Sequence, residues 1–133
     1  MSAFVDTNVL IRHLTGDPPE MAIRATAFLG SETDLLLADL VVAETVYVLE
    51  SFYEAPRPQI SRSVRSLLAL ESVVCVDAPL LRRAVEIYET DRLDFAEAYL
   101  VASAESTGIN RIVSFDRSID RVRTVERIEP GDV

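Results

Sequence analysis

The sequence predicts an α/β fold of three layers, in which helices flank a mostly parallel central sheet of four or five strands. Short apolar segments, typical of buried strands, alternate along the chain with longer segments of helical period. Each helical segment lies between two such strands, as right-handed crossovers between parallel strands require. No repeat or linker interrupts this alternation, so residues 1–133 are predicted to form a single domain.

Composition narrows the possible functions. The net charge is −9, and all 13 basic residues are arginine, which argues against P-loop, Schiff-base and lysine-dependent phosphoryl sites. The one histidine, His13, is expected to be a partly exposed helix residue, and the one cysteine, Cys75, a buried small hydrophobe. We find no membrane span and no secretion signal, so we expect a cytoplasmic protein without a membrane partner.

The first predicted strand, residues 3–6, ends in Asp6 and leads directly into a helix over residues 7–15. Ligands of open α/β sheets bind beyond the carboxyl ends of the strands, so Asp6 is a candidate functional residue. It could equally serve as the N-cap of the helix. A proline-marked break then precedes a helix over residues 18–29, and residues 34–38 form the second strand.

The next helix, from residue 40 to about 53, is apolar on nearly all sides, and we expect it to be buried with Asp39 as its cap. Glu44 lies in its first two turns without a charged neighbour at helical spacing. A buried carboxylate must be protonated, paired or bound to a metal. The alternative is that Glu44 reaches water through a gap in the packing.

The amphipathic helix over residues 58–71 presents arginines that either form a solvated face or contact a phosphate backbone. They are Arg57, Arg62 and Arg65. Residues 73–76 form the third strand, and a helix follows from residue 78 to about 91.

Asp94 and Glu97 lie in the first turn of a second mostly apolar helix, over residues 93–104. Their spacing puts both on one helix face, as in a capping box or a shared ligand site. Residues 111–115 then repeat the opening pattern, a short apolar strand followed by Asp116, and residues 124–128 form the last strand.

Five carboxylates are predicted to meet at one edge of the sheet, because the carboxyl ends of parallel strands lie together. They are Asp6, Glu44, Asp94, Glu97 and Asp116. So many acids without a lysine repel one another unless divalent cations bind them. Oxygen ligands suit Mg²⁺ or Mn²⁺ rather than zinc. Such ions activate water and stabilise the leaving oxygen in phosphodiester hydrolysis.

The order of FVDTNVL, VVAET, LDFAEAYLVASA and IVSFDRSID resembles that of PIN-domain ribonucleases, most closely the VapC toxins of toxin–antitoxin pairs. The resemblance covers nearly the whole chain. It implies a PIN-like domain and a Mg²⁺- or Mn²⁺-dependent endoribonuclease that inhibits translation or growth. It also implies a homodimer, and a small VapB-like antitoxin whose C-terminal segment blocks the acidic pocket.

Position by position, the resemblance assigns Asp6, Glu44 and Asp116 to the first, second and last acids of the family. It assigns supporting polar roles to Asn8 and Ser114. The chain departs from the family at Glu97, where aspartate is usual, although many members have a further aspartate at the position of Asp94. Either of these two acids could therefore be the direct third ligand.

The mechanism that this predicts is in-line attack of water on an RNA phosphodiester, which leaves a 5′-phosphate and a 3′-hydroxyl. Two alternatives remain. A haloacid-dehalogenase-like phosphohydrolase would also place an aspartate after the first strand, but it would normally have aspartate at position 8 and a downstream lysine. A non-catalytic module would instead use the acids to dock a basic partner peptide.

Overall fold

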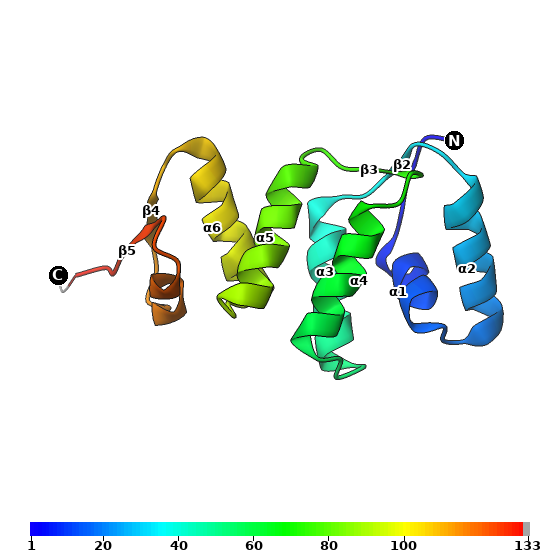
Figure 1. Ribbon diagram of the computed structural model, residues 1–133, viewed down its shortest axis with the longest axis horizontal. Coiled ribbons are helices and arrows are strands. Elements are labelled where there is room, and N and C mark those ends of the chain that lie inside the picture. The colour runs from blue at the N-terminus through cyan, green and yellow to red at the C-terminus, as the bar shows by residue number, and fades with distance from the viewer. Residues whose placement is uncertain (132–133) are drawn as a thin grey trace. The chain divides into compact units, whose positions relative to one another are not determined.

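A computed structural model describes residues 1–131 of the chain. Within this range the chain forms six α-helices, one 3₁₀-helix and five short strands (Figure 1). It divides into two compact units, Met1–Ala78 and Pro79–Val133, and both contain fully buried apolar side chains. None of the described helices combines the length and the apolar character that crossing a membrane requires.

The first unit contains a parallel sheet with the strand order β1–β2–β3. Its strands are β1 (Ala3–Phe4), β2 (Leu35–Leu36) and β3 (Val73–Val74). The ladder continues one residue further, because the Val5 amide donates a hydrogen bond to the Leu36 carbonyl at 3.0 Å. The chain is therefore held in the sheet up to the residue before Asp6.

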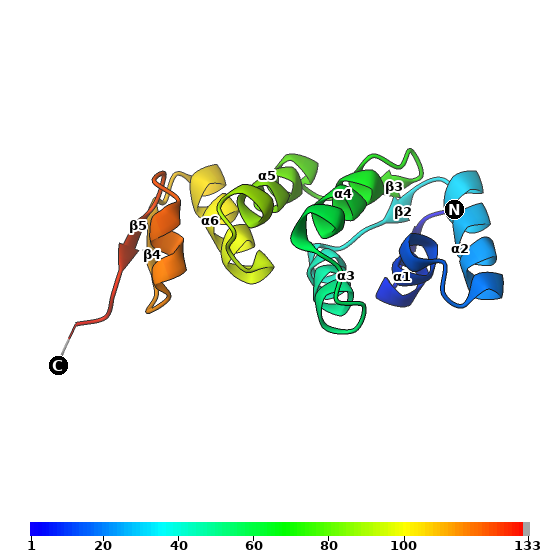
Figure 2. The same ribbon diagram turned by 60° about the horizontal axis from the view of Figure 1, so that its bottom comes forward.

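Four helices accompany this sheet, and all four lie where the sequence predicted them. They are α1 (Thr7–Thr15), α2 (Pro19–Ser31), α3 (Asp39–Ser51) and α4 (Arg57–Leu68). Helix α1 packs against α2 and α3, and α3 packs against α4 (Figures 1 and 2). Leu10, Val42 and Leu67 from three of these helices are completely buried. Of the arginines predicted to point outward, Arg62 and Arg65 are exposed.

The second unit contains two helices, a 3₁₀-helix and a parallel pair of strands. They are α5 (Ala78–Thr90), α6 (Phe95–Thr107), β4 (Arg111–Val113), η1 (Arg117–Arg121) and β5 (Glu126–Ile128). The apolar positions of α5 are buried as its periodicity predicted, including Leu81 and Ile87. Tyr88 of α5 meets Phe95 of α6 edge to face, with ring centroids 6.0 Å apart.

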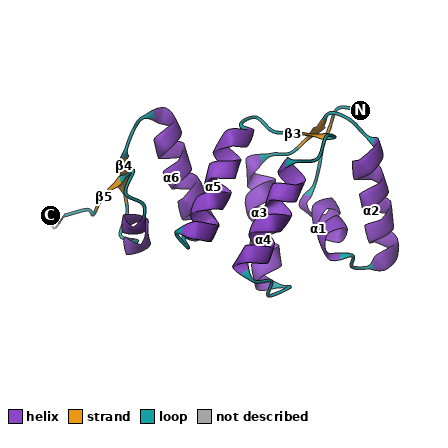
Figure 3. Cartoon of the chain, in the orientation of Figure 1, coloured by secondary structure: helices purple, strands orange, loops and turns teal. Residues whose placement is uncertain are grey.

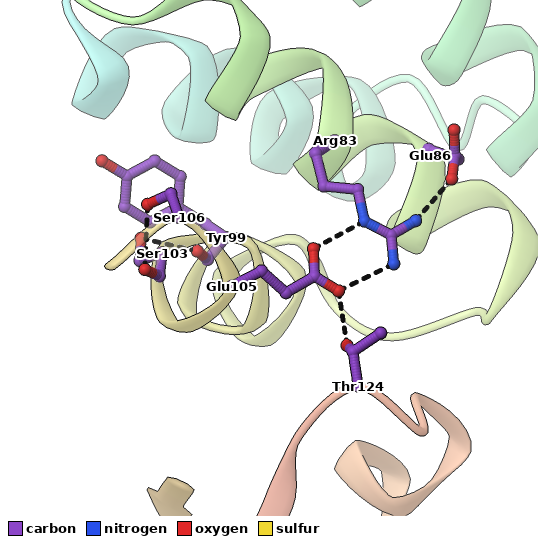
Figure 4. A network of polar contacts seen from close by, with 7 residues as sticks. All are labelled: Arg83, Glu86, Tyr99, Ser103, Glu105, Ser106 and Thr124. Atoms are coloured by element: carbon purple, nitrogen blue, oxygen red, sulfur yellow. Dashed lines mark hydrogen bonds and ion pairs between the residues drawn. The ribbon is translucent and has the colours of Figure 1, made fainter. Parts of the chain in front are cut away.

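An ionic network centred on Arg83 joins three segments of the second unit (Figure 4). Arg83 of α5 donates two hydrogen bonds to the carboxylate of Glu105 on α6, at 2.7 and 2.8 Å, and also pairs with Glu86. The hydroxyl of Thr124, in the segment before β5, hydrogen-bonds to Glu105. Planar, two-point pairing of this kind fixes the orientation of the two side chains relative to one another, in addition to pairing their charges.

The prediction of one central sheet of four or five strands is not met in the described residues. The strands are parallel, as expected, but they form a three-stranded and a two-stranded sheet, one in each unit (Figure 3). Each strand is only two or three residues long, so each ladder has few hydrogen bonds. Apolar patterning marks where a strand runs, but it does not determine which strand lies beside it.

The prediction that α3 is buried all round is also wrong. Leu40 and Tyr47 are 80% and 66% exposed, and Glu44, on the same face, is exposed as well. Asp39 is the first residue of the helix rather than its cap, since the N-cap position is taken by Ala38. Cys75 is half-buried rather than buried.

Candidate functional site

Asp6 lies at the junction of β1 and α1, exposed and at the N-cap position of the helix. One carboxylate oxygen accepts a hydrogen bond from the Thr7 amide at 2.8 Å, so Asp6 does cap α1. The other oxygen accepts from the side-chain amide of Asn8 at 3.2 Å. Both contacts come from neighbours in the sequence, and they fix the carboxylate at the start of the helix.

A cavity of about 240 Å³ lies between the start of α1 and the second turn of α3. Asp6, Asn8 and Glu44 all line it. The structure therefore brings together three of the predicted site residues within the first unit. Because the donors are two carboxylates and an amide oxygen, they suit a hard divalent cation such as Mg²⁺ or Mn²⁺.

Arg12, which was not among the candidate residues predicted from the sequence, also lines this cavity. It lies four residues after Asn8 on α1, which places the two side chains on one helix face. That spacing is the signal that could have identified it.

In the second unit, Asp94 and Glu97 occupy the positions expected of a capping box. Asp94 is the N-cap residue of α6, and Glu97 lies in its first turn. The Asp94 side chain nevertheless makes no capping hydrogen bond. Asp94 is exposed and Glu97 is half-buried. The two residues thus occupy the positions of a capping box along the chain, but the exposed Asp94 carboxylate does not cap the helix.

Asp116 follows β4 and caps η1. Its carboxylate accepts a hydrogen bond from the Ser118 amide at 2.9 Å, while its own amide donates to the hydroxyl of Ser114 at 2.9 Å. Hydrogen bonding from Ser118 holds the pKa of Asp116 below its usual value, and the charges of Arg121 and Arg127 act in the same direction. The carboxylate therefore keeps its charge to a lower pH than an unperturbed aspartate does.

Two arginines that were not among the predicted site residues hold the segments beside these acids. Arg121 donates to the backbone carbonyls of Asp91 and Arg92, at 3.5 and 3.0 Å, in the turn before Asp94. Arg127 donates to the Ser114 carbonyl at 2.9 Å, and its side chain is only 11% exposed.

The five candidate acids are divided between the two units, with Asp6 and Glu44 in the first and the other three in the second. Within residues 1–131, no three histidine, cysteine, aspartate or glutamate side chains lie close enough together to hold a metal ion. The ligand set predicted from the sequence thus stays a prediction, and Asp6 with Glu44 is the pair that shares a cavity.

His13 is a partly exposed residue of α1, as expected. Its Nδ1 lies 2.8 Å from the hydroxyl of Thr26, which connects α1 to α2. Partial burial lowers the pKa of the imidazole.

The sequence matches the PIN domain over residues 3–125. This match includes every candidate acid. No curated protein matches the chain.

Proposed function

Because the chain belongs to the PIN domain family, whose members are typically nucleases, we propose that it is a Mg²⁺- or Mn²⁺-dependent endoribonuclease. The observation that carries this proposal is the cavity that Asp6, Asn8 and Glu44 share. An exposed carboxylate beyond the carboxyl end of a parallel strand, with a second one from α3 lining the same cavity, suits metal-assisted phosphodiester hydrolysis. The family match favours a nuclease over the haloacid-dehalogenase-like alternative.

In this proposal Asp6 and Glu44 would hold the cation, and Asp94 or Glu97 or both, together with Asp116, would complete the ligand set of a single PIN-like domain. The cation supplies charge that activates water and stabilises the leaving oxygen. Asn8 holds one oxygen of Asp6 through the 3.2 Å hydrogen bond and so fixes the direction of the carboxylate. The Ser114 hydroxyl instead accepts a hydrogen bond from the backbone amide of Asp116 and so fixes the backbone at that residue.

We also propose that the protein is a cytoplasmic toxin that forms a homodimer and is inhibited by a small antitoxin. The order of its four motifs, which resembles that of VapC toxins, supports this role. The net charge of −9 would attract a basic antitoxin segment to the acidic cavity.

Cleavage of total RNA by the antitoxin-free chain tests the proposal. We expect discrete fragments with 5′-phosphate and 3′-hydroxyl ends, formed with Mg²⁺ or Mn²⁺ and abolished by EDTA. Asp6→Asn and Glu44→Gln should lower the rate by more than roughly 100-fold. Glu20→Gln is the matched control, because Glu20 is an exposed acid on α2 that does not line the Asp6 cavity.

Parallel measurements on Asp94→Asn and Glu97→Gln would identify the third ligand. It is the residue whose substitution weakens the affinity for Mn²⁺ more. Fragments that end in a 2′,3′-cyclic phosphate, or full activity in EDTA, would contradict the mechanism. A folded wild-type chain that cuts no RNA, yet binds a basic peptide without metal, would favour the docking module.

A further inference from the structure

Arg12 is the one basic residue among those that line the Asp6 cavity. The cavity walls otherwise consist of the acids Asp6 and Glu44, two small polar residues and two apolar side chains. Arg12 lies one helical turn beyond Asn8 and is half-buried. A positive charge is thus held beside the predicted metal ligands by the same helix that Asp6 caps.

The guanidinium group of Arg12 is unpaired in the part of the chain that the structure describes. Its Nε atom is buried and has no hydrogen-bond partner within residues 1–131. Although two carboxylates line the same cavity, Arg12 forms an ion pair with neither within that range. The two terminal guanidinium nitrogens are not among the buried atoms without a partner, so they are the donors that an acceptor from outside the chain can reach.

The overall charge restricts what that acceptor can be. A chain with net charge −9 repels a phosphate backbone, so RNA binding needs local cations close to the cut. Arginine presents several donors in a planar fork that matches a phosphate group. The only other positive charge at the cavity would be the divalent cation of the proposed centre.

We propose that Arg12 binds a backbone phosphate of the RNA substrate next to the Asp6–Glu44 pair. The inference rests on the proposed nuclease function and adds the residue that holds the substrate. Arg12 supplies the charge and the donors that fix the phosphate, while the acids are reserved for the cation. Contacts of this kind position nucleic acid without reading its sequence.

The test is the binding of a short fluorescent single-stranded RNA by the full chain, with Ca²⁺ in place of Mg²⁺, across a range of salt concentrations. Loss of one phosphate contact should reduce the slope of log Kd against log salt by about 0.7. We therefore expect Arg12→Gln to weaken binding roughly tenfold and to show this smaller slope. Arg12→Lys should keep the slope but recover only part of the affinity, because lysine has no fork.

Arg24→Gln is the matched control. Arg24 is exposed on α2 and makes no hydrogen bond or ion pair within the described residues, so its loss removes the same charge from the same unit. With Mg²⁺, Arg12→Gln should raise KM more than it lowers kcat. The far-ultraviolet circular dichroism of each variant monitors folding, and Arg12→Lys provides the test if Arg12→Gln fails to fold.

The inference would be overturned if Arg12→Gln kept the wild-type affinity and salt slope, or if Arg24→Gln lost as much affinity as Arg12→Gln. If the wild type still cleaved RNA in that case, the proposed function would stand. An unfolded Arg12→Gln together with an Arg12→Lys that loses the salt slope would overturn the inference as well. A wild-type chain that neither binds nor cuts RNA would overturn the proposed function and the inference together.

Discussion

Asp6 has two separable roles at the scale of a single side chain, because it caps α1 and lines the candidate site. Asparagine caps helices about as well as aspartate, whereas alanine does not. We expect Asp6→Asn to keep the free energy of unfolding within about 0.5 kcal/mol of the wild type, and Asp6→Ala to lose about 0.5–2 kcal/mol. Urea denaturation measures both values.

Both Asp6 variants should lose metal-dependent RNA cleavage, since neither keeps the carboxylate. Equal activity in Asp6→Asn and the wild type would show that Asp6 acts as a cap alone. Equal stability of Asp6→Ala and the wild type would show that the hydrogen bond to the Thr7 amide contributes nothing.

The imidazole of His13 should make stability depend on pH. Because partial burial lowers its pKa in the folded state, the unfolded chain binds the proton more tightly. The free energy of unfolding therefore has its full value above the pKa of His13 in the unfolded chain, about 6.5. It falls as the pH drops below that value towards the pKa of His13 in the folded chain.

His13→Gln should remove this loss, while the amide can still hydrogen-bond to Thr26. Urea denaturation at pH values of about 7.5 and 5.5 measures the difference, since most carboxylates titrate lower. The same decline in stability in both proteins would assign the pH dependence to other groups.

The sequence predicted correctly the positions of residues that depend on near neighbours in the chain. The positions of Asp6, Asn8 and Asp116 relative to their strands and helices follow from a few neighbouring residues. The burial expected of the helix around Glu44 is not observed, and Glu44 is exposed to water, as the alternative interpretation had it. Large apolar side chains often lie at the surface, and Leu40 and Tyr47 do so beside it.

At the scale of secondary structure, the Arg83–Glu105 pair connects α5 to α6 and can be tested by one substitution. Arg83 is the main cause of the lowered pKa of Glu105, so the carboxylate is held in its charged form. Glu105→Gln keeps the shape but loses the charge. We expect it to lower the free energy of unfolding by about 1–2 kcal/mol, less than for a fully buried pair.

Thermal or urea denaturation measures the effect, with Glu86→Gln as the control. Glu86 pairs with the same arginine, but its side chain is 58% exposed, so its loss should cost much less. Equal effects of the two substitutions would contradict a special role for Glu105. A smaller loss at high salt should accompany both.

Helices were more predictable than sheets. Periodicity, prolines and caps are local signals, and they placed all six α-helices to within a few residues. The strands were located as well, but their partners were not. A strand of two or three residues carries little register information, so its pairing depends on packing that one sequence does not show.

At the scale of the whole chain, we predict that residues 1–133 unfold as one domain. The unit from Pro79 onward is small, and its strand pair β4–β5 has only three residues a side. Units of this size are marginally stable alone, so the stability of one should depend on the other. Hydrogen exchange in increasing urea should therefore show α3 and α5 losing protection at the same midpoint. Two separate midpoints would mean that the units are independent domains.

The contact between His13 and Thr26 makes the only imidazole of this chain a natural spectroscopic probe. Its ring protons would give one pair of resonances in a proton spectrum, with no other histidine to confuse the assignment. The ring belongs to the same helix as Asp6 and Arg12. The binding of metal or RNA at the beginning of α1 could thus be followed by titrating either into unlabelled protein and observing this single side chain.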